Sequence, residues 1–496
     1  MRNFQPYDVL GIVLIAMIFV LVMIRIDIFP IYIDIYYHLA IMRSFDIVGG
    51  IALHDFIQFA PFGRPHIYPP FFHILLYVPY KLGIGPESLA KVSSALIFPS
   101  ILFTSWYTIK KIFSPRVGLL TTLILASSFP FFFMSSMYCA SMVSTVLFLW
   151  CMLFLYEKKT VSSIVLMSMS LYSHPSCPHM FSATLLIWAL LDEERRNMIL
   201  KALGAAYILF LPWGMSILLR AGSFRELGTH SYLPEVYIIA ALLGVIGAYL
   251  SIRKAIYEKK RVYVLPLSLL MLFLPVHYFY GSRAFVHYFI PLSMLCAIAI
   301  DGAMAKCIDA HEGGRGLKVL AALLVIIVAA SSCSLVLIPN KDDKFQATAE
   351  STLKVLITGS MGASSIYGYD NELIDQILAH TDADDIIYVE NRIVGTYISG
   401  LTGRATTSGI FMEVEPDDEY ELGGPFGAFV YNDPEDPRIS GNSAVFITEK
   451  HVLEIIDDNN ITKVATPKRN LPIALAIAMI LISIIALLND NKIHKK

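Results

Sequence analysis

Charged side chains are scarce in this sequence. Asp, Glu, Lys and Arg make up 16% of the 496 residues, whereas soluble domains carry roughly 25%. Hydrophobic residues reach 56%, and they gather in blocks of about twenty residues, the length that an α-helix needs to cross a bilayer. This pattern excludes a soluble globular protein and predicts a multispanning membrane protein.

Cysteine is scarce too, because the chain has only six, and all six lie in or beside the apolar blocks. None falls between 339 and 470, so a disulfide framework is not expected there. That region also lacks a Gly-rich phosphate loop, a metal-spaced Cys/His set and the serine-hydrolase elbow. The chain has no internal repeat and almost no charges at mid-membrane positions, which argues against a transporter or flippase.

The apolar blocks predict about twelve spanning helices. Lys and Arg gather in alternate loops, so the positive-inside rule places both termini in the cytoplasm. This topology requires that the apolar segment Pro70–Tyr80, about a dozen residues long, lies in the interface without crossing. The predicted spans are 8–28, 90–109, 117–135, 140–156, 161–174, 179–191, 198–219, 231–251, 263–280, 287–305, 317–338 and 471–488.

Three regions follow from this topology. Residues 1–338 form a multispanning module, residues 339–470 a small extracytoplasmic α/β domain, and residues 471–496 an anchor helix with a basic cytoplasmic tail. In the α/β domain the sequence predicts helices at 369–380, 392–401 and 450–458, and strands at 385–390, 444–448 and 461–466.

The loop at 29–80 is rich in polar residues for a connector between membrane segments. It contains three aspartates, four histidines and two arginines among many aromatics. If residues 33–45 are helical, Asp34, Tyr37 and His38 lie on one face. We therefore predict that these three residues are catalytic. The alternative for Asp34 is an N-cap of the helix that follows.

This loop begins with Asp34-Ile-Tyr-Tyr-His38-Leu and continues with Asp55, Pro61-Phe-Gly63 and Tyr68-Pro-Pro-Phe. These residues resemble the first extracytoplasmic loop of the catalytic subunit of oligosaccharyltransferase, especially the archaeal form. They also resemble the wider GT-C superfamily, whose members are polytopic glycosyltransferases that use lipid-phosphate-linked sugars. The resemblance implies a GT-C-like α-helical polytopic membrane fold. It also implies that Asp34 is catalytic or binds a divalent metal, Mg²⁺ or Mn²⁺.

Two departures from the oligosaccharyltransferase pattern narrow this expectation. The family's second acidic motif has no counterpart at 135–141, and residues 341–470 lack the Trp-Trp-Asp-type motif by which those enzymes recognise their sequon. We therefore favour a transferase of a single sugar, with oligosaccharyltransferase-like protein glycosylation as the alternative.

Substrate-binding residues are predicted at three further places. Arg283 and His287, four residues apart at the mouth of two spans, would present phosphate-binding donors on one helical face; the alternative for Arg283 is a snorkelling side chain. His174 lies in a Pro-containing turn between two short spans, where the alternative is a purely structural turn. Asp55 and Arg64 of the loop complete this set.

Together these residues predict sugar transfer from a polyprenyl- or dolichyl-phosphate-linked donor to an acceptor at the outer face of the cell membrane. Asp34 would act as general base, alone or through a metal, and Arg283, His287 and Arg64 would neutralise the departing phosphate. Displacement by one nucleophile inverts the anomeric carbon. The expected partners are membrane lipid, the lipid-linked sugar and a protein, lipid or glycan acceptor, with no nucleic acid. A non-catalytic cell-surface scaffold is a further alternative.

Overall fold

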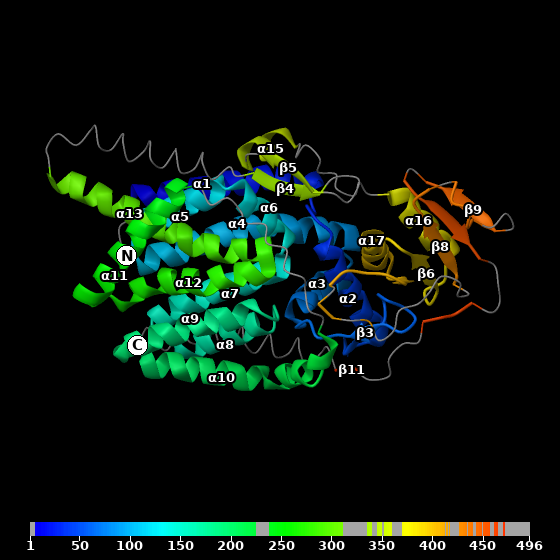
Figure 1. The fold of residues 1–496 in the computed structure, drawn as a ribbon, viewed down its shortest axis with the longest axis horizontal. Helices are drawn as coiled ribbons and strands as arrows, with labels where there is room; N and C mark the ends of the chain where they lie inside the picture. Colours follow the sequence, from blue (N-terminus) through cyan, green and yellow to red (C-terminus); the bar gives the residue numbers. More distant parts are fainter. Residues whose placement is uncertain are drawn as a thin grey trace.

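The computed structural model describes residues 5–224, 238–310 and, with short gaps, 335–471. A bundle of long helices occupies one end of the elongated molecule, and a smaller region with a β-sheet occupies the other (Figure 1). The helices of the bundle are α1 (Pro6–Ile24), α4 (Pro86–Ile112), α5 (Pro115–Ser127), α6 (Phe129–Met137), α7 (Cys139–Tyr156), α8 (Thr160–Leu171), α9 (Cys177–Leu191), α10 (Glu193–Leu218), α11 (Ile238–Tyr257), α12 (Val264–Tyr280) and α13 (Phe285–Ala310).

Among the described residues, six helices are long and apolar enough to cross a bilayer, and the bent pair of α5 and α6 makes seven. Three shorter apolar helices, at 160–171, 177–191 and 261–277, accompany them. The helical polytopic fold is therefore confirmed. Ten of the twelve predicted spans overlap a helix of the bundle. The other two, 317–338 and 471–488, lie largely outside the described residues, and their described ends are strands, β4 (Leu335–Pro339) and β11 (Asn470–Leu471).

The span predicted at 117–135 is broken in the middle. The axes of α5 and α6 differ by 80°. Between them Ser128 is extended, and its hydroxyl accepts a hydrogen bond from the backbone N–H of Phe131, so the chain starts a new helix. Pro130 in the first turn of α6 favours this start, since it needs no hydrogen-bond acceptor there. Tyr138 follows α6 and takes the N-cap position of α7.

The loop at 29–80 folds as a compact unit at the junction between the bundle and the sheet-containing region (Figure 1). The predicted helix near Asp34 is present, and it stops at Gly49, whose positive φ of 67° is readily adopted by glycine. The predicted interfacial segment at 70–80 is a short helix. The short helix η1 (Ile26–Ile28) precedes the loop, and the elements of the loop are α2 (Asp34–Val48), β1 (Ile51–Ala52), β2 (His54–Asp55), β3 (Arg64–Pro65) and α3 (Phe71–Lys81).

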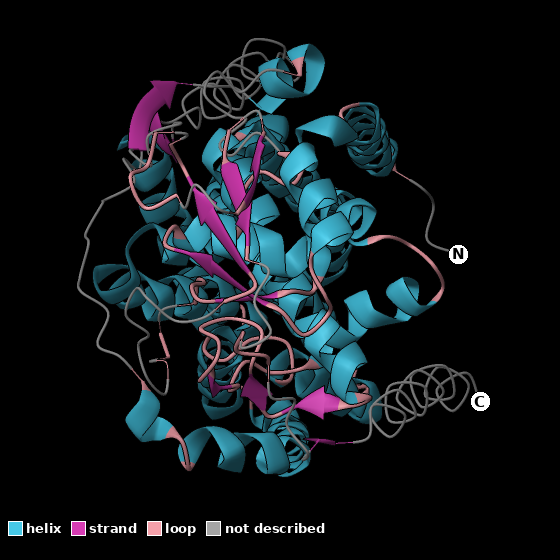
Figure 2. Cartoon of the chain, turned by 90° about the vertical axis from the view of Figure 1, so that its right-hand side faces the viewer, coloured by secondary structure: helices cyan, strands magenta, loops and turns pink. Residues whose placement is uncertain are grey.

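The sheet-containing region has a five-stranded mixed sheet, in the order β7-β6-β8-β10-β9. The strand β6 runs parallel to β7 and β8, whereas β10 runs antiparallel to β8 and β9. Figure 2 looks along the molecule from this end and shows the strands in front of the helices. The elements are α16 (Asn371–His380), β6 (Ile386–Val389), α17 (Arg392–Thr402), β7 (Ala405–Thr406), β8 (Ala428–Tyr431), β9 (Ala444–Ile447) and β10 (Val452–Ile455). The helix α15 (Thr352–Thr358) lies instead against α1 and α5 of the bundle.

Sequence periodicity correctly located α16, β6, α17 and β9 in this region. The helix predicted at 450–458 is wrong, because Val452–Ile455 forms the strand β10, with a neighbour on each side. The pattern of apolar and polar residues in a run of only four does not show whether the run is a short buried strand or one turn of a helix. The strands β7 and β8 and the antiparallel hairpin of β4 and β5 (Phe345–Ala349) were not predicted. At 461–466 the described residues contain one isolated bridge, between Lys463 and Asp385.

The sheet-containing region is docked on the loop through α17, which packs on α2. Gly400 makes this close approach possible, since a Cβ at this position would lie 2.6 Å from the backbone oxygen of Tyr36. Gln58 of the loop donates hydrogen bonds to Thr396 and Ser399 of α17. The strand β1 of the loop pairs with β11, more than four hundred residues later. The loop and the sheet-containing region therefore form one continuous structure.

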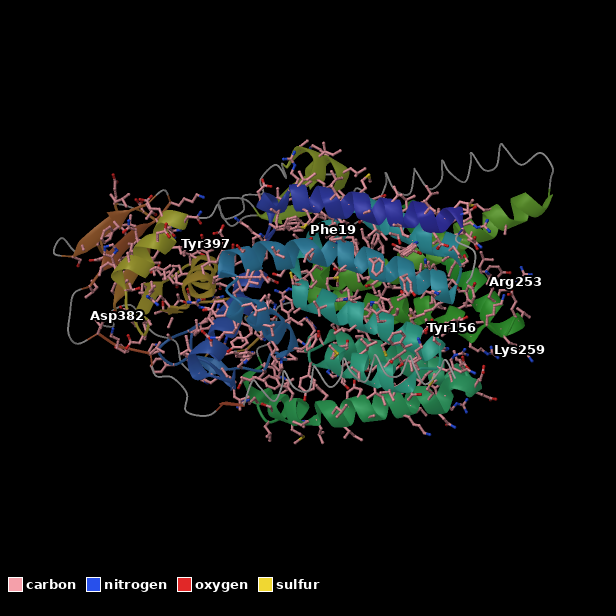
Figure 3. The ribbon with its side chains drawn as sticks, turned by 180° about the vertical axis from the view of Figure 1, so that it is seen from behind. Phe19, Tyr156, Arg253, Lys259, Asp382 and Tyr397 are labelled. Carbon is pink, nitrogen blue, oxygen red and sulfur yellow. The ribbon has the colours of Figure 1, made fainter. Side chains whose placement is uncertain are left out.

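Basic residues at the end of α11 and in the loop after it lie at the far end of the bundle. Arg253 and Lys259 lie at the end of the bundle farthest from the sheet-containing region, and Asp382 lies in that region at the opposite end (Figure 3).

Candidate active site

Asp34 is the first residue of α2 and not its N-cap. Ile33 holds the N-cap position, and no side chain caps this helix. The interpretation of Asp34 as a cap is therefore wrong, because its carboxylate is one position too far along the chain. Burial raises the pKa of Asp34 to about 6, against the opposing effect of Arg283 and with a contribution from Glu413. A carboxylate with this pKa is a stronger base than an exposed aspartate and is still mostly ionised at neutral pH.

Arg283 and Glu413 form an ion pair that acts on Asp34. Arg283 lies in the short 3₁₀ helix η4 (Gly281–Ala284), and its Nη1 donates to Oε1 of Glu413. The Arg283 side chain is 51% exposed, whereas the Glu413 side chain is only 12% exposed. Burial opposes the positive charge, but Tyr138, Glu413 and Asp34 outweigh it and raise the pKa of Arg283 above its usual range. Arg283 is therefore a permanent cation beside the base.

Tyr138 contributes a phenol to the same place. It follows the break after α6 and is half-buried at the start of α7. Its effect on the pKa of Arg283, together with that of Asp34, places the three side chains in one electrostatic group. Tyr138 thus stands in the segment 135–141, where the sequence contains no acidic motif.

Tyr37 is buried in an aromatic cluster. Its ring stacks on Phe411 with centroids 5.2 Å apart and meets Tyr68 edge to face at 5.9 Å. Burial raises the pKa of Tyr37 well above its usual value, only partly offset by the guanidinium of Arg64. A phenol that remains protonated is suited to packing and hydrogen bonding and not to proton abstraction.

His38 points into a second buried cluster, which it forms with His66 and His73. Nδ1 of His38 and Nε2 of His73 lie 3.0 Å apart, and the rings of His66 and His73 are 5.5 Å apart. Burial, reinforced by the neighbouring imidazole of His66, lowers the pKa of His38 to about 3. His38 is therefore neutral at physiological pH. Although His38 shares the helix with Asp34, its ring is engaged by His73 and packed against Phe72.

Asp55 and Arg64 face each other across the hairpin of β2 and β3. Nε of Arg64 donates to Oδ2 of Asp55 at 3.1 Å, and both side chains are 1% exposed. The other Arg64 nitrogens donate to Oε1 of Gln58 and to the backbone oxygens of Ile410 and Phe411. Both side chains thus bond other groups of the protein, and Arg64 holds the backbone of the segment that leads to Glu413.

His287 lies inside the bundle, in the first turn of α13. Arg283 lies in η4, which leads directly into α13, and the two side chains contact different partners. Nε2 of His287 lies 3.0 Å from Sγ of Cys177, and Nδ1 lies 3.3 Å from Oγ1 of Thr145. Both ring nitrogens therefore have partners within the protein.

His174 lies in the turn before α9, at the border of the site. Its Nδ1 accepts hydrogen bonds from the backbone N–H groups of Ser176 and Cys177, at 3.2 and 3.3 Å. Its ring meets Tyr68 edge to face at 5.7 Å. Burial lowers the pKa of His174 well below its usual value, so this residue is neutral at physiological pH.

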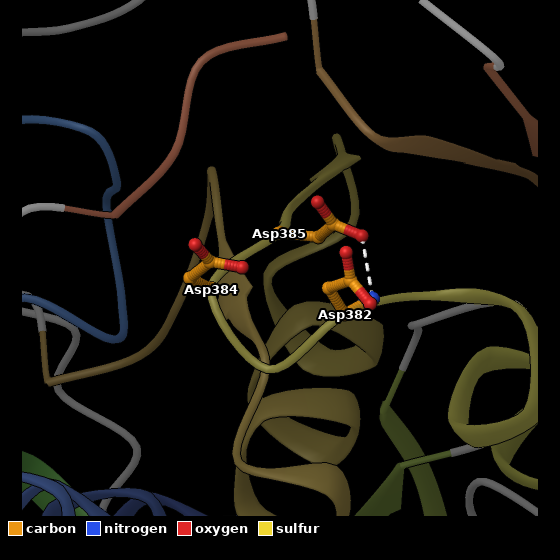
Figure 4. A group of neighbouring side chains, drawn as sticks. All are labelled: Asp382, Asp384 and Asp385. Atoms are coloured by element: carbon orange, nitrogen blue, oxygen red, sulfur yellow. Dashed lines mark hydrogen bonds between the residues drawn. The ribbon is translucent and has the colours of Figure 1, made fainter. Parts of the chain in front are cut away.

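Carboxylates gather closely at one other place in the described residues. Asp382, Asp384 and Asp385 place ligand atoms within 4.8 Å of one another (Figure 4). Nζ of Lys463 contacts Asp385 and lies 3.3 Å from Asp384, so this cluster already has a cation. The charge of Glu413 contributes to the raised pKa of Asp34, and Glu413 itself accepts a hydrogen bond from Arg283.

Glu413 and Tyr138 are the site residues that the sequence did not reveal. Glu413 lies 130 residues from Arg283 in the chain and stands in an acidic stretch with no motif around it. Tyr138 is one of many tyrosines in apolar surroundings. Neither has a local signal, because both reach the site through the tertiary fold.

This arrangement defines a membrane protein whose polar site lies where the helix bundle meets a small sheet-containing region. Solved structures with the same fold include the oligosaccharyltransferase of Archaeoglobus fulgidus tethered to an acceptor peptide, with a TM-score of 0.53 and 11% identity over 76% of this chain and 60% of that one. The archaeal oligosaccharyltransferase AglB from Archaeoglobus fulgidus, in complex with an inhibitory peptide and a dolichol-phosphate, also has a TM-score of 0.53. Its identity is 10% over 81% of the present chain and 65% of the AglB chain.

ArnT from Cupriavidus metallidurans bound to undecaprenyl phosphate is similar over nearly its whole length. Its TM-score is 0.53, with 13% identity over 89% of this chain and 97% of that one. The present chain spans less than two thirds of the archaeal oligosaccharyltransferase. No protein-family model matches the sequence, and no curated protein matches it either. The helical polytopic fold that the resemblance of the loop at 29–80 implies is therefore confirmed, because the chain shares the fold of these two proteins.

Proposed function

We propose that this protein is a membrane glycosyltransferase that moves a sugar from a polyprenyl- or dolichyl-phosphate-linked donor to an acceptor. The observation that carries the proposal is the group of Asp34, Arg283 and Glu413 at the junction between bundle and sheet-containing region. Two proteins of the same fold are described with dolichol-phosphate and with undecaprenyl phosphate. A donor of this kind has a tail soluble in the bilayer and a head that needs a polar site at its edge.

Asp34 is the general base in this proposal. It would accept the proton of the acceptor hydroxyl or amide as the acceptor attacks the anomeric carbon, while the bond from that carbon to the phosphate oxygen breaks. One displacement of this type inverts the configuration. The raised pKa of Asp34 suits this role, because a base is most effective when its pKa approaches the working pH.

Arg283 is the phosphate-binding residue. Its planar guanidinium can donate two parallel hydrogen bonds to a phosphate, and its exposed half is accessible to a ligand. Negative charge grows on the phosphate as it departs, so a fixed cation stabilises the transition state more than the ground state. Tyr138 would add a hydroxyl donor to the same oxygen atoms.

The remaining predicted residues act by positioning. Arg64 and Asp55 hold the backbone next to Glu413, and Tyr37 supports Phe411 in the same segment. His38, His174 and His287 are neutral or internally bonded groups that pack around the site. A divalent cation would be held by Asp34, where it would supply Lewis-acid stabilisation of negative charge.

The proposed location is the cell membrane, with both termini in the cytoplasm and residues 339–470 outside. The basic side chains at the far end of the bundle support this orientation. The three proposed regions, 1–338, 339–470 and 471–496, then correspond to the spanning module, the outer domain and the anchor. The acceptor would be a protein, lipid or glycan that approaches from the outer side.

The proposal is tested with the purified full-length protein in lipid nanodiscs. Polyprenyl-phosphate-linked hexoses, radiolabelled in the sugar, are supplied together with a membrane extract as the source of acceptor, and the unlabelled lipid phosphate is run separately as a product standard. We expect loss of labelled donor and formation of free lipid phosphate by the wild-type protein, with little or none by Asp34→Asn. Equal turnover by both proteins would remove Asp34 from the mechanism, and intact donor with every sugar tried would contradict the proposed function.

A further inference from the structure

Glu413 reaches the site on a segment that ties the sheet-containing region to the bundle. The described residues of this segment are Ile410, Phe411, Glu413 and Val414, and we call them the Glu413 segment. Val414 forms an antiparallel bridge with Phe224, which follows α10, and Glu413 bonds Arg283 before α13. The segment is thus attached to two separate loops of the bundle.

Arg64 holds the start of this segment through two hydrogen bonds to its backbone. Its Nη2 donates to the backbone oxygen of Ile410 at 2.7 Å, and its Nη1 donates to that of Phe411 at 2.8 Å. From the other side, Oγ1 of Thr396 accepts a hydrogen bond from the Ile410 N–H at 3.0 Å. Because Arg64 is itself held by Asp55 in the interior, the segment rests on a rigid support.

Phe411 has a backbone conformation that non-glycine residues seldom adopt. Its φ is 66°, in the left-handed region. The conformation persists because the carbonyl is bonded to Arg64 and the ring is packed between Tyr37 and Tyr68. Residues held in such conformations concentrate at functional sites. Here the constrained turn sends the chain toward Arg283, and Glu413 follows two residues later.

The pair formed by Glu413 and Arg283 is unequal in its exposure. The carboxylate side chain is 12% exposed and the guanidinium side chain 51%. Carboxylate and phosphate bind guanidinium through the same geometry of two oxygens and two N–H groups. A phosphate that approaches the exposed side of Arg283 therefore meets donors that Glu413 already uses in part.

We infer that Glu413 is the resident counter-ion of Arg283 in the substrate-free site, and that the phosphate of the donor displaces it from the guanidinium. This inference rests on the proposed role of Arg283 as the phosphate-binding residue. Glu413 is then a residue that determines affinity and specificity for the donor. It keeps the cation paired while the site is empty, and it penalises any anion that binds Arg283 too weakly to replace a carboxylate.

The test measures binding of undecaprenyl phosphate to the full-length protein in nanodiscs. Glu413→Gln keeps the size of the side chain and removes its charge. We expect this variant to bind the lipid phosphate about 3- to 10-fold more tightly than wild type, as expected when a competing, partly exposed ion pair is removed. Glu413→Asp keeps the competitor and should remain close to wild type. Glu372→Gln, on the exposed first turn of α16, makes the same change in net charge away from the site and should also match wild type.

Unchanged or weaker binding by Glu413→Gln, with a thermal midpoint like that of wild type, would overturn the inference and make Glu413 a support for Arg283. Tighter binding by Glu372→Gln as well would assign the effect to net charge and also overturn it. Arg283→Ala distinguishes a failure of the proposed phosphate-binding role of Arg283 from a failure of the inference about Glu413. If wild type binds the lipid phosphate and this variant does not, the phosphate-binding role stands and Glu413→Gln alone decides the inference. If Arg283→Ala binds as wild type does, the proposed role of Arg283 fails first.

Discussion

Replacing Asp34 by Asn is expected to make the protein less active and more stable. The carboxylate lies in α2, outside the spanning helices, and burial raises its pKa from 3.8 to about 6. The folded state therefore binds the proton more tightly than the unfolded state, and the ionised carboxylate costs stability. With about 1.4 kcal/mol for each pKa unit, the cost at neutral pH is about 3 kcal/mol as an upper bound.

The sign of this effect gives the pH profile. Because the folded pKa is raised, the penalty is absent below the unfolded pKa of Asp34 and complete above the folded one. The stability gained by Asp34→Asn should therefore be largest above about pH 7 and disappear near pH 4. Transfer should fall by about 10²–10⁴-fold if a general base is lost. In the wild-type protein, transfer should decline as the pH falls through about 6.

The assay pairs thermal unfolding in nanodiscs at pH 4.5, 6 and 7.5 with sugar transfer at pH 7.5, on wild type and Asp34→Asn. A variant that is inactive and equally stable at every pH would refute the argument that burial raises the pKa. A variant that is more stable at pH 7.5 but fully active would confirm the burial and remove Asp34 from catalysis.

Three further outcomes follow. Arg283→Lys keeps the charge but loses the planar guanidinium, so turnover of the donor should fall while expression stays normal. Wild-type kinetics in this variant would indicate that Arg283 is only a snorkelling side chain. Arg64→Ala leaves Asp55 buried without its partner and should cost about 3–5 kcal/mol of stability. A small change in the thermal midpoint would contradict the argument that the pair of Arg64 and Asp55 supports the fold. A cysteine at Glu372 should react with an impermeant reagent added outside cells, and one at Lys158 should not, whereas the reverse pattern would invert the topology.

The spanning helices could be predicted from sequence because the bilayer demands them. Backbone groups in hydrocarbon must be bonded within their own segment, so each apolar block such as 140–156 becomes a helix. The bend after Ser127 was not predicted, because it depends on a local helix cap at Ser128. In the sequence, the signal of this cap is weak beside the long apolar run. The strand Val452–Ile455 was mistaken for helix because its two partner strands, and not its own sequence, decide its conformation.

The site was predictable only where its residues are near one another in the chain. Asp34 stood out through its neighbours, and Arg283 through its position at the mouth of a span. The link from Arg283 to His287 relied on helical spacing, which does not reveal that the two side chains bond different partners. Asp55 and Arg64 were noticed as charges, but their mutual pairing is set by the register of the hairpin. Glu413 required the fold, since it is 130 residues from its partner.

The contact between α17 and α2 joins the distant parts of this site, which leads to a final prediction. Gly400→Ala would place a methyl group 2.6 Å from the backbone oxygen of Tyr36, and a backbone atom cannot rotate away as a side chain can. The helix α17 must then shift, at a cost of about 1–3 kcal/mol. Since the Ile410 N–H is bonded to Thr396 of α17, the shift should also displace the Glu413 segment and reduce transfer. Gly204→Ala in α10, where a Cβ meets no atom within 4 Å, is the matched control and should leave stability equal or slightly higher. Equal thermal midpoints and equal transfer for the two variants would show that the close approach of α17 to α2 does not support the site.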